Sequence, residues 1–339
     1  MRNNKIDLLR FIGLAMIVFA HISPPTLLFQ IRNFDVPLMV FISGVSFKLS
    51  YKPNKSYINY IWKRVKRLVF PPWIFLAFFF IISHFVFKNE IPMHSIVTSF
   101  IFLSGIGYVW IIGVFLLMSF IAPFLYSVEK RMGANSHFFI YIVLAFVFYE
   151  VFQQSTHQYF IANKYLKIIG RIIFYIIPYS IIYLLGIRIL RFSKKSIAII
   201  SGFCFLVFAA LGVCLYIREG YFVPTQIYKF PLSTYYVSYA MAISMLLWVV
   251  GDFIWLKLNE KLKVFVLFVS ENSIWIYLWH IPFVFLINTW DANFILEYVL
   301  VLFLAILMVF IQVNFLEKVI ITKLSNKKTI KNLRVLFKG

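Results

Sequence analysis

Charged residues and cysteines are scarce in this sequence of 339 residues. Only 13% of the residues are charged, whereas 62% are hydrophobic. Because soluble globular proteins carry about 25% charged residues, the composition excludes an ordinary soluble domain. The two cysteines, Cys204 and Cys214, would lie about 15 Å apart on one helix. That separation is too long for a disulfide bond, and the spacing does not fit metal ligands.

The common short signatures of soluble catalysts are also missing. We find no G-x-S-x-G nucleophile elbow, no H-E-x-x-H zinc motif and no glycine-rich phosphate loop. We therefore expect no metal ion and no tightly bound cofactor. Acidic residues number only 12 against 33 lysines and arginines, which gives a net charge of +21. Most of the basic excess flanks apolar segments, so it indicates topology and anionic lipid rather than nucleic acid.

Apolar segments long enough to cross a bilayer recur along the whole chain. A spanning helix needs about 20 apolar residues, whereas membrane β-barrels show short alternating strands. We predict an all-α polytopic membrane protein with about ten transmembrane helices. They lie at roughly 6–28, 34–50, 70–88, 99–127, 137–154, 171–190, 196–216, 234–256, 264–287 and 294–317. The fourth contains two glycines and is alternatively a short interfacial piece followed by a span from Tyr108.

Basic residues alternate between the predicted loops. The N-terminal segment, every second loop and the C-terminal end hold 25 of the 33 lysines and arginines, while the other five loops hold 7. Because cytoplasmic loops carry this excess, we predict a multi-pass protein of the plasma membrane with both termini in the cytoplasm. We assign residues 1–320 to one integral-membrane domain and 321–339 to a basic cytoplasmic tail on the inner leaflet.

Two ionisable side chains, Arg10 and His21, lie eleven positions apart in the first apolar segment. Eleven residues make almost three helical turns, so both would share one helix face, about 16 Å apart. Ionisable groups within a bilayer are costly and usually functional, and a histidine can act as a general base near neutral pH. Two alternatives remain open. Arg10 can be a snorkelling residue paired with Asp7, and His21 can be a hydrogen-bonded packing residue.

A basic cluster precedes the third predicted span. Arg64 and Arg67 are three positions apart, so they share a face if this segment is helical, and Pro71 and Pro72 follow them. Guanidinium groups bind phosphates through paired hydrogen bonds, which makes the two arginines a candidate phosphate site. The alternative is an ordinary cytoplasmic anchor for the third span.

His280 lies in the middle of the ninth predicted span, two residues before Pro282. A proline frees a backbone carbonyl one turn back and can kink the helix towards a cavity. We expect His280 either to orient a substrate or to hydrogen-bond another helix for structural reasons.

Three further residues are candidates for orienting a substrate. Asp35 opens the second span near the end of the first, and it either orients the His21 imidazole or caps its own helix. Trp110 follows a glycine-rich stretch and either stacks on a ligand or lies at the membrane interface. Glu150 precedes the polar run QQSTHQ, which contacts a hydrophilic acceptor or is simply solvated.

Together these features resemble acyltransferase family 3, whose members are membrane-bound acyltransferases of cell-surface glycans. The resemblance covers nearly the whole chain. It includes Arg10 and His21 within an ID-x-L-R opening, and the Arg-x-x-Arg pair of Arg64 and Arg67 with its following prolines. The segments FISG, VWIIGVFLL, FPLSTYYVSYAMAISMLLW and NSIWIYLWHIP are also similar to family blocks. Each motif is weak alone, but their order and spacing make the resemblance specific.

The resemblance implies an acyl-CoA donor, usually acetyl-CoA, that approaches from the cytosol. Arg10, Arg64 and Arg67 would neutralise the phosphates of this donor. His21 would activate the acceptor hydroxyl or briefly carry the acyl group. We therefore expect a membrane O-acyltransferase, in the simplest case an O-acetyltransferase, which transfers groups other than aminoacyl groups. Its acceptor would be a sugar hydroxyl of a surface polysaccharide or of its lipid-linked precursor.

Two other classes of function remain open from the sequence. A transporter or flippase for a glycan or an anionic substrate would place Arg10, His21 and His280 along a polar pathway. A non-enzymatic partner in a glycan assembly complex would need none of them. The expected partners are acyl-CoA, a glycan or lipid-linked acceptor and membrane lipids, and a homo-oligomer is compatible with the sequence.

Overall fold

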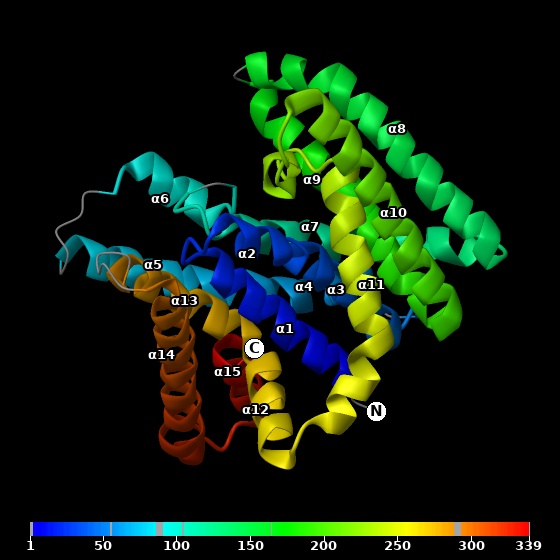
Figure 1. Ribbon diagram of the computed structural model, residues 1–339. Helices are drawn as coiled ribbons and strands as arrows, with labels where there is room; N and C mark the ends of the chain where they lie inside the picture. The colour runs from blue at the N-terminus through cyan, green and yellow to red at the C-terminus, as the bar shows by residue number, and fades with distance from the viewer. Residues whose placement is uncertain are drawn as a thin grey trace. The chain divides into compact units, whose positions relative to one another are not determined.

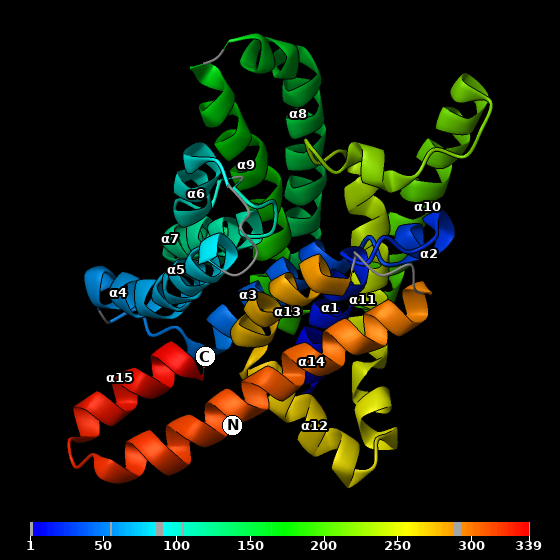
Figure 2. The same cartoon turned by 90° about the vertical axis from the view of Figure 1, so that its left-hand side faces the viewer.

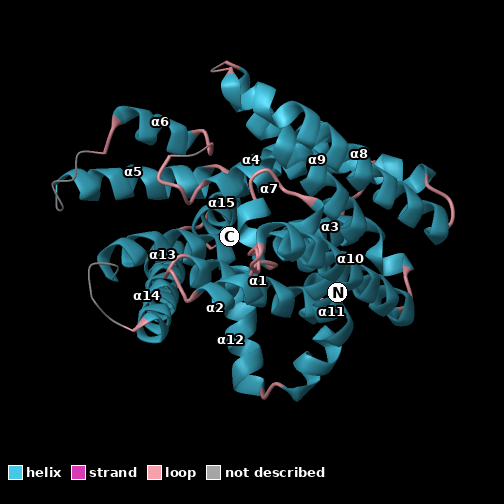
Figure 3. Cartoon of the chain, turned by 45° about the horizontal axis from the view of Figure 1, so that its top comes forward, coloured by secondary structure: helices cyan, strands magenta, loops and turns pink. Residues whose placement is uncertain are grey.

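Every regular element in the described part of the chain is a helix. The computed structural model describes residues 3–54, 56–85, 91–103, 105–163, 165–287 and 293–338, and no strand occurs among them (Figure 3). The predicted fold class is therefore confirmed. The chain divides into two compact units. Unit 1 consists of Met1–Gly13, Pro25–Pro53 and Phe120–Leu258, and unit 2 consists of Leu14–Pro24, Asn54–Ser119 and Asn259–Gly339.

The number of helices that can span a membrane is slightly below the ten predicted. Eight in the described residues are long and apolar enough, or nine if one bent pair counts as a span. The first predicted span, 6–28, explains the difference. Helix α1 (Asn4–Ala20) has only 17 residues and reaches about 26 Å, less than the bilayer core of about 30 Å. The chain breaks after Ala20 and continues as the short α2 (Thr26–Ile31).

Unit 1 is a bundle of long apolar helices. Helix α10 packs on α11, α3 packs on α9, and α8 packs on α9 (Figure 1). Local signals set their ends, since the Ser193 and Ser233 side chains accept backbone N–H groups at the starts of α10 and α11. Gly220 ends α10 in the left-handed conformation. The bounds are α3 (Asp35–Ser50), α8 (Asn135–Ala162), α9 (Leu166–Arg188), α10 (Lys194–Glu219) and α11 (Thr234–Lys257).

Helices α3 and α9 approach each other closely through two glycines. A Cβ atom on Gly44 would lie 2.2 Å from the carbonyl oxygen of Tyr183, and a Cβ on Gly186 would lie 2.1 Å from that of Phe41. Only a residue without a side chain fits at either position. Gly44 belongs to the FISG segment, and small residues of this kind let membrane helices pack backbone to backbone.

Ion pairs within unit 1 join segments that the charge pattern assigns to the same side of the membrane. The buried carboxylate of Glu129, in α7 (Trp110–Arg131), lies 2.9 Å from Lys48 Nζ and 3.2 Å from Arg188 Nη1. These residues lie near the ends of three helices whose following loops are all predicted to be cytoplasmic. Lys5 and Asp252, also from two predicted cytoplasmic segments, are paired at 2.8 Å. The contacts therefore agree with the alternation of basic loops.

Unit 2 contains a sharply bent helix pair at the ninth predicted span. Helices α12 (Glu260–Glu271) and α13 (Ser273–Ile287) meet at an angle of 82° (Figure 1). Helix α13 packs on α14 and on α5. The fourth predicted span takes its alternative form, because α6 ends before a loop and α7 begins at Trp110. The remaining bounds are α4 (Tyr57–Leu68), α5 (Phe70–Phe85), α6 (Met93–Phe100) and α14 (Phe294–Phe315).

Within unit 2, the basic C-terminal tail forms a helix, α15 (Lys327–Phe337), which packs on α4 and α5. The indole N–H of Trp275 donates to the carbonyl of Leu336 at 2.8 Å, and the amide of Gln312 donates to that of Phe337 at 2.7 Å. Figure 2 shows α15 folding back towards the end of α14, where Arg334 pairs with Glu317. The predicted domain boundary at 320 stays a prediction, but residues Lys327–Phe337 beyond it form a helix that packs on the rest of unit 2.

Candidate active site

Two histidines that are 259 positions apart in the sequence lie against each other in unit 2. Nδ1 of His21 is 2.8 Å from Nε2 of His280. The two rings are stacked, with centroids 5.0 Å apart and planes inclined by 16°. His280 is fully buried on α13, and His21 is partly exposed. The sequence indicated each residue separately, and the structure brings them together.

The local sequence places His21 at a break in the backbone. The His21 N–H donates to the Val18 carbonyl, which closes the last turn of α1. The chain cannot continue as a helix, because prolines follow at positions 24 and 25 and disfavour helical geometry in the residues before them. Ser23 adopts a left-handed backbone with φ of 49°. The imidazole therefore projects from the end of α1 rather than from the middle of a straight helix.

The hydrogen bonds assign the tautomers of the pair. Nδ1 of His280 lies within hydrogen-bond distance of the Tyr277 carbonyl, which only accepts, so Nδ1 carries the hydrogen. A neutral imidazole has one N–H, and Nε2 of His280 is therefore an acceptor. The hydrogen between the two rings then belongs to Nδ1 of His21, an assignment made from the network. In this assignment the lone pair of His21 lies on Nε2.

Two tyrosines enclose the imidazole pair. The Tyr108 ring meets the edge of His21 with centroids 4.7 Å apart, and the Tyr277 hydroxyl donates to the Tyr108 carbonyl. Burial raises the pKa of Tyr108 above its usual value. Our reading of the sequence missed both tyrosines. The spacing of Tyr277 and His280, one helical turn, was the available signal.

Arg10 lies on α1, in the part that belongs to unit 1. Its guanidinium contacts the Asp7 carboxylate and the Ser46 hydroxyl, both at 3.3 Å. The predicted ion pair with Asp7 is therefore present. The Arg10 side chain is 25% exposed, so it is not sealed from ligands. Its role towards a donor stays a prediction.

Arg64 and Arg67 lie on α4 in unit 2. The spacing of the two arginines predicts that they share a face if this segment is helical. Because α4 is helical from Tyr57 to Leu68, they do. The Arg64 guanidinium lies over the ring of Tyr60 at 5.2 Å from its centroid, and Arg67 is exposed. Helix α15, which is also basic, packs on α4.

Asp35 starts α3 within a buried polar cluster of unit 1. Its carboxylate accepts from Arg32 at 2.7 Å and from the Val36 N–H at 2.7 Å. The partner Arg32, 1% exposed, was missed in the sequence, although the two residues are one helical turn apart. Nearby, burial lowers the pKa of Lys229 to about 8, and the Asp35 carboxylate opposes that shift. A role of Asp35 in orienting His21 stays a prediction.

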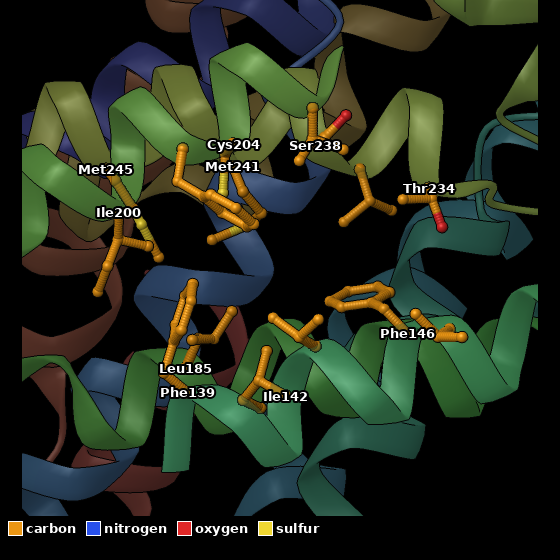
Figure 4. A pocket seen from close by; sticks show the side chains of 15 residues that line it. Phe139, Ile142, Phe146, Leu185, Ile200, Cys204, Thr234, Ser238, Met241 and Met245 are labelled. Carbon is orange, nitrogen blue, oxygen red and sulfur yellow. The ribbon is translucent and has the colours of Figure 1, made fainter. Parts of the chain in front are cut away.

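Glu150 ties α8 to the start of α11. One carboxylate oxygen accepts from both the N–H and the hydroxyl of Thr234, at 2.7 and 2.8 Å. Thr234 and Ser238 line one side of an apolar cavity of about 230 Å³, and Phe146 faces them from α8 (Figure 4). The Glu150 carboxylate therefore stabilises the N-terminus of α11, where a negative charge is favourable. Contact with an acceptor stays a prediction.

Trp110 is the first residue of α7 and lies two positions after Tyr108. Its stacking on a ligand is untested. Among the described residues, no group of three or more histidine, cysteine or acidic side chains is arranged to hold a metal ion.

The model of the acyltransferase domain of the acyltransferase 3 family matches residues 3–312. This chain belongs to the acyltransferase 3 family. It is therefore an acyltransferase, and its long apolar helices make it a multi-pass membrane protein. No curated protein and no solved structure matches the chain. All eight residues singled out from the sequence lie inside the matched region of this acyltransferase 3 protein, whereas α15 lies beyond it.

Proposed function

We propose that this acyltransferase moves an acyl group from cytosolic acyl-CoA to a sugar hydroxyl. In the simplest case the acyl group is acetyl, and the acceptor is a surface polysaccharide or its lipid-linked precursor at the plasma membrane. The observation that carries the proposal is the contact of 2.8 Å between Nδ1 of His21 and Nε2 of His280, from which the basic lone pair of His21 is assigned to Nε2. Acyl transfer to a hydroxyl needs a base of this kind.

In this proposal His21 acts as the general base. The acceptor oxygen attacks the thioester carbonyl, a C–O bond forms and the C–S bond breaks. Nε2 of His21 takes the hydroxyl proton and returns it to the departing CoA sulfur. The Nδ1–H of the resulting imidazolium donates more strongly to His280, because hydrogen bonds from a charged donor are stronger. His280 is a positioning residue for His21. The same lone pair also suits an acyl-histidine route.

The basic residues of the proposal serve the donor. The family resemblance assigns Arg10, Arg64 and Arg67 to the phosphates of CoA. The helical spacing of Arg64 and Arg67 supports a shared phosphate site, since guanidinium groups bind phosphate in a bidentate manner. We place Trp110, next to Tyr108, at the acceptor. Asp35 fixes the start of its own helix α3, and Glu150 fixes the start of α11; a role of both in orienting the acceptor is part of the proposal.

The test is transfer of radiolabel from acetyl-CoA to surface glycan by the purified full-length protein in vesicles. We expect labelled glycan ester. Vesicles that move glycan across the membrane and form no ester would favour a transporter and overturn the proposal.

The donor site is tested with Arg64→Ala plus Arg67→Ala. We expect the KM for acetyl-CoA to rise about 10- to 100-fold, because a hydrogen bond to a charged group contributes about 1.5–3 kcal/mol. The matched control is Lys63→Ala plus Lys66→Ala, which removes two charges from the same helix. An equal rise in KM for both variants would show that general positive charge, and not the arginine pair, binds the donor.

A further inference from the structure

A cavity of about 700 Å³ lies one aromatic layer from the imidazole pair, within unit 2. Phe285 on α13 forms part of its wall, and its ring centroid is 5.7 Å from that of Tyr108. Tyr108 in turn contacts His21. Trp279 and Pro282, which flank His280 on α13, also line the cavity. Only the Tyr108 ring therefore separates this part of the cavity wall from the proposed base.

The wall of the cavity is apolar. It consists of aromatic and aliphatic side chains from α5 and α13, with segments around residues 91–95 and 105–106 at the rim. None of the described residues that line it is charged. Ser83, 6% exposed, and Ser95 supply hydroxyl groups. Burying the phosphates of CoA or a bare oligosaccharide here would leave polar groups without partners, which is unfavourable. A hydrocarbon chain has no such cost.

One side of the cavity opens on the surface that faces lipid. Among its lining residues, Phe78 on α5 is 62% exposed, and Leu286 on α13 is 43% exposed. Helix α5 belongs to a spanning segment, and α13 belongs to the bent pair. Exposed apolar side chains on such helices contact lipid tails. A hydrocarbon chain that already lies in the bilayer can enter the cavity sideways through this opening. A donor dissolved in the cytosol would not approach from the lipid.

We propose that this cavity holds the hydrocarbon chain of a lipid-linked sugar acceptor and so brings the sugar hydroxyl to His21. The inference rests on the proposed function and narrows it, because the acceptor is then the lipid-linked precursor and not the finished polysaccharide. The volume lies within the range of about 300–1,000 Å³ that is typical of small-molecule sites. It is far larger than an acetyl group requires.

The test variant is Ile82→Trp, which puts an indole at the mouth of the cavity. Ile82 lines the cavity and is 45% exposed. Its neighbour Ile81 is 56% exposed and is not among the lining residues. Ile81→Trp therefore adds the same indole to the same helix outside the cavity, which makes it a matched control. Leu286→Trp repeats the obstruction from α13, in case Ile82→Trp inserts poorly.

The assay uses full-length protein in vesicles with radiolabelled acetyl-CoA. One acceptor is the lipid-linked saccharide fraction of the producing cells, and a second is the same saccharides after mild acid has removed the lipid. A third is purified surface polysaccharide. We expect the wild type to label the lipid-linked fraction at least tenfold faster than either other acceptor. We expect Ile82→Trp and Leu286→Trp to lower that rate about tenfold, with Ile81→Trp within twofold of the wild type.

Several outcomes would overturn the inference. Equal labelling of the intact and the delipidated saccharides, or faster labelling of the polysaccharide, would remove the need for a chain while leaving the proposed function intact. Equal rates for Ile82→Trp and Ile81→Trp would show that only bulk lipid occupies the cavity. A loss confined to long-chain acyl-CoA donors would assign the cavity to the donor. Absence of label in every acceptor would refute the proposed function as well.

Discussion

The hydrogen bond between His280 and the Tyr277 carbonyl sets the assigned tautomer of His280 and, through it, that of His21, the proposed base. It fixes the hydrogen of His280 on Nδ1, and His280 then fixes the hydrogen of His21 on Nδ1 as well. Nothing in the sequence reveals this series of hydrogen bonds, because the two histidines are 259 positions apart. The candidate residues could be predicted because placing an ionisable side chain in a membrane costs free energy, so such residues are usually functional. Their pairing depends on tertiary packing, which a local pattern does not contain.

Substitution of His280 tests the positioning role. In His280→Leu the hydrogen of His21 is no longer held on Nδ1, and we expect kcat to fall about tenfold, as the loss of one hydrogen bond allows. His280→Gln keeps an acceptor oxygen and should recover most of that loss. The measurement is kcat for acetyl transfer at saturating donor and acceptor. Equal kcat values for the leucine and glutamine variants would mean that His280 serves packing alone.

At the scale of helices, the sequence determines where most elements occur, and tertiary contacts determine how they bend and end. The apolar runs locate α10 and α11 to within three residues at each end. Helix α9 begins five residues before its predicted start, and α8 continues eight residues past its predicted end, through the polar run QQSTHQ. The ninth span was predicted as one helix, but it bends by 82° near Asn272. Asn272 is fully buried and its side chain donates to the Phe268 carbonyl. A polar residue inside an apolar run gave too weak a signal to place this bend.

The crossing of α3 and α9 gives a test at this scale. Gly44→Ala forces a methyl group against the Tyr183 carbonyl, and overpacking of this kind costs about 1–3 kcal/mol. Gly202→Ala on α10 is the matched control, since a Cβ there meets nothing within 4 Å. We expect a clearly lower thermal unfolding midpoint for Gly44→Ala, and an unchanged or slightly higher one for Gly202→Ala. Equal midpoints would show that the crossing tolerates separation of the helices.

At the scale of the whole molecule, the chain combines a membrane fold with a pair of contacting histidines and a surplus of positive charge. The alternation of basic loops predicted the sides of the membrane, and ion pairs such as Lys5 with Asp252 join segments of one predicted side. The docking of α15 could not be predicted, because it depends on single hydrogen bonds from Trp275 and Gln312. The family match shows that the chain is an acyltransferase, and we propose that transfer occurs at the pair of His21 and His280.

The most direct measurement is the rate of acetyl transfer by His21→Ala in the same vesicles as the wild type. His94→Ala, on the exposed face of α6, is the matched control. Loss of a general base lowers the rate about 10²–10⁴-fold, and we expect a loss of this size for His21→Ala with normal insertion and abundance. His94→Ala should keep the wild-type rate. Transfer by His21→Ala at the wild-type rate would contradict the account.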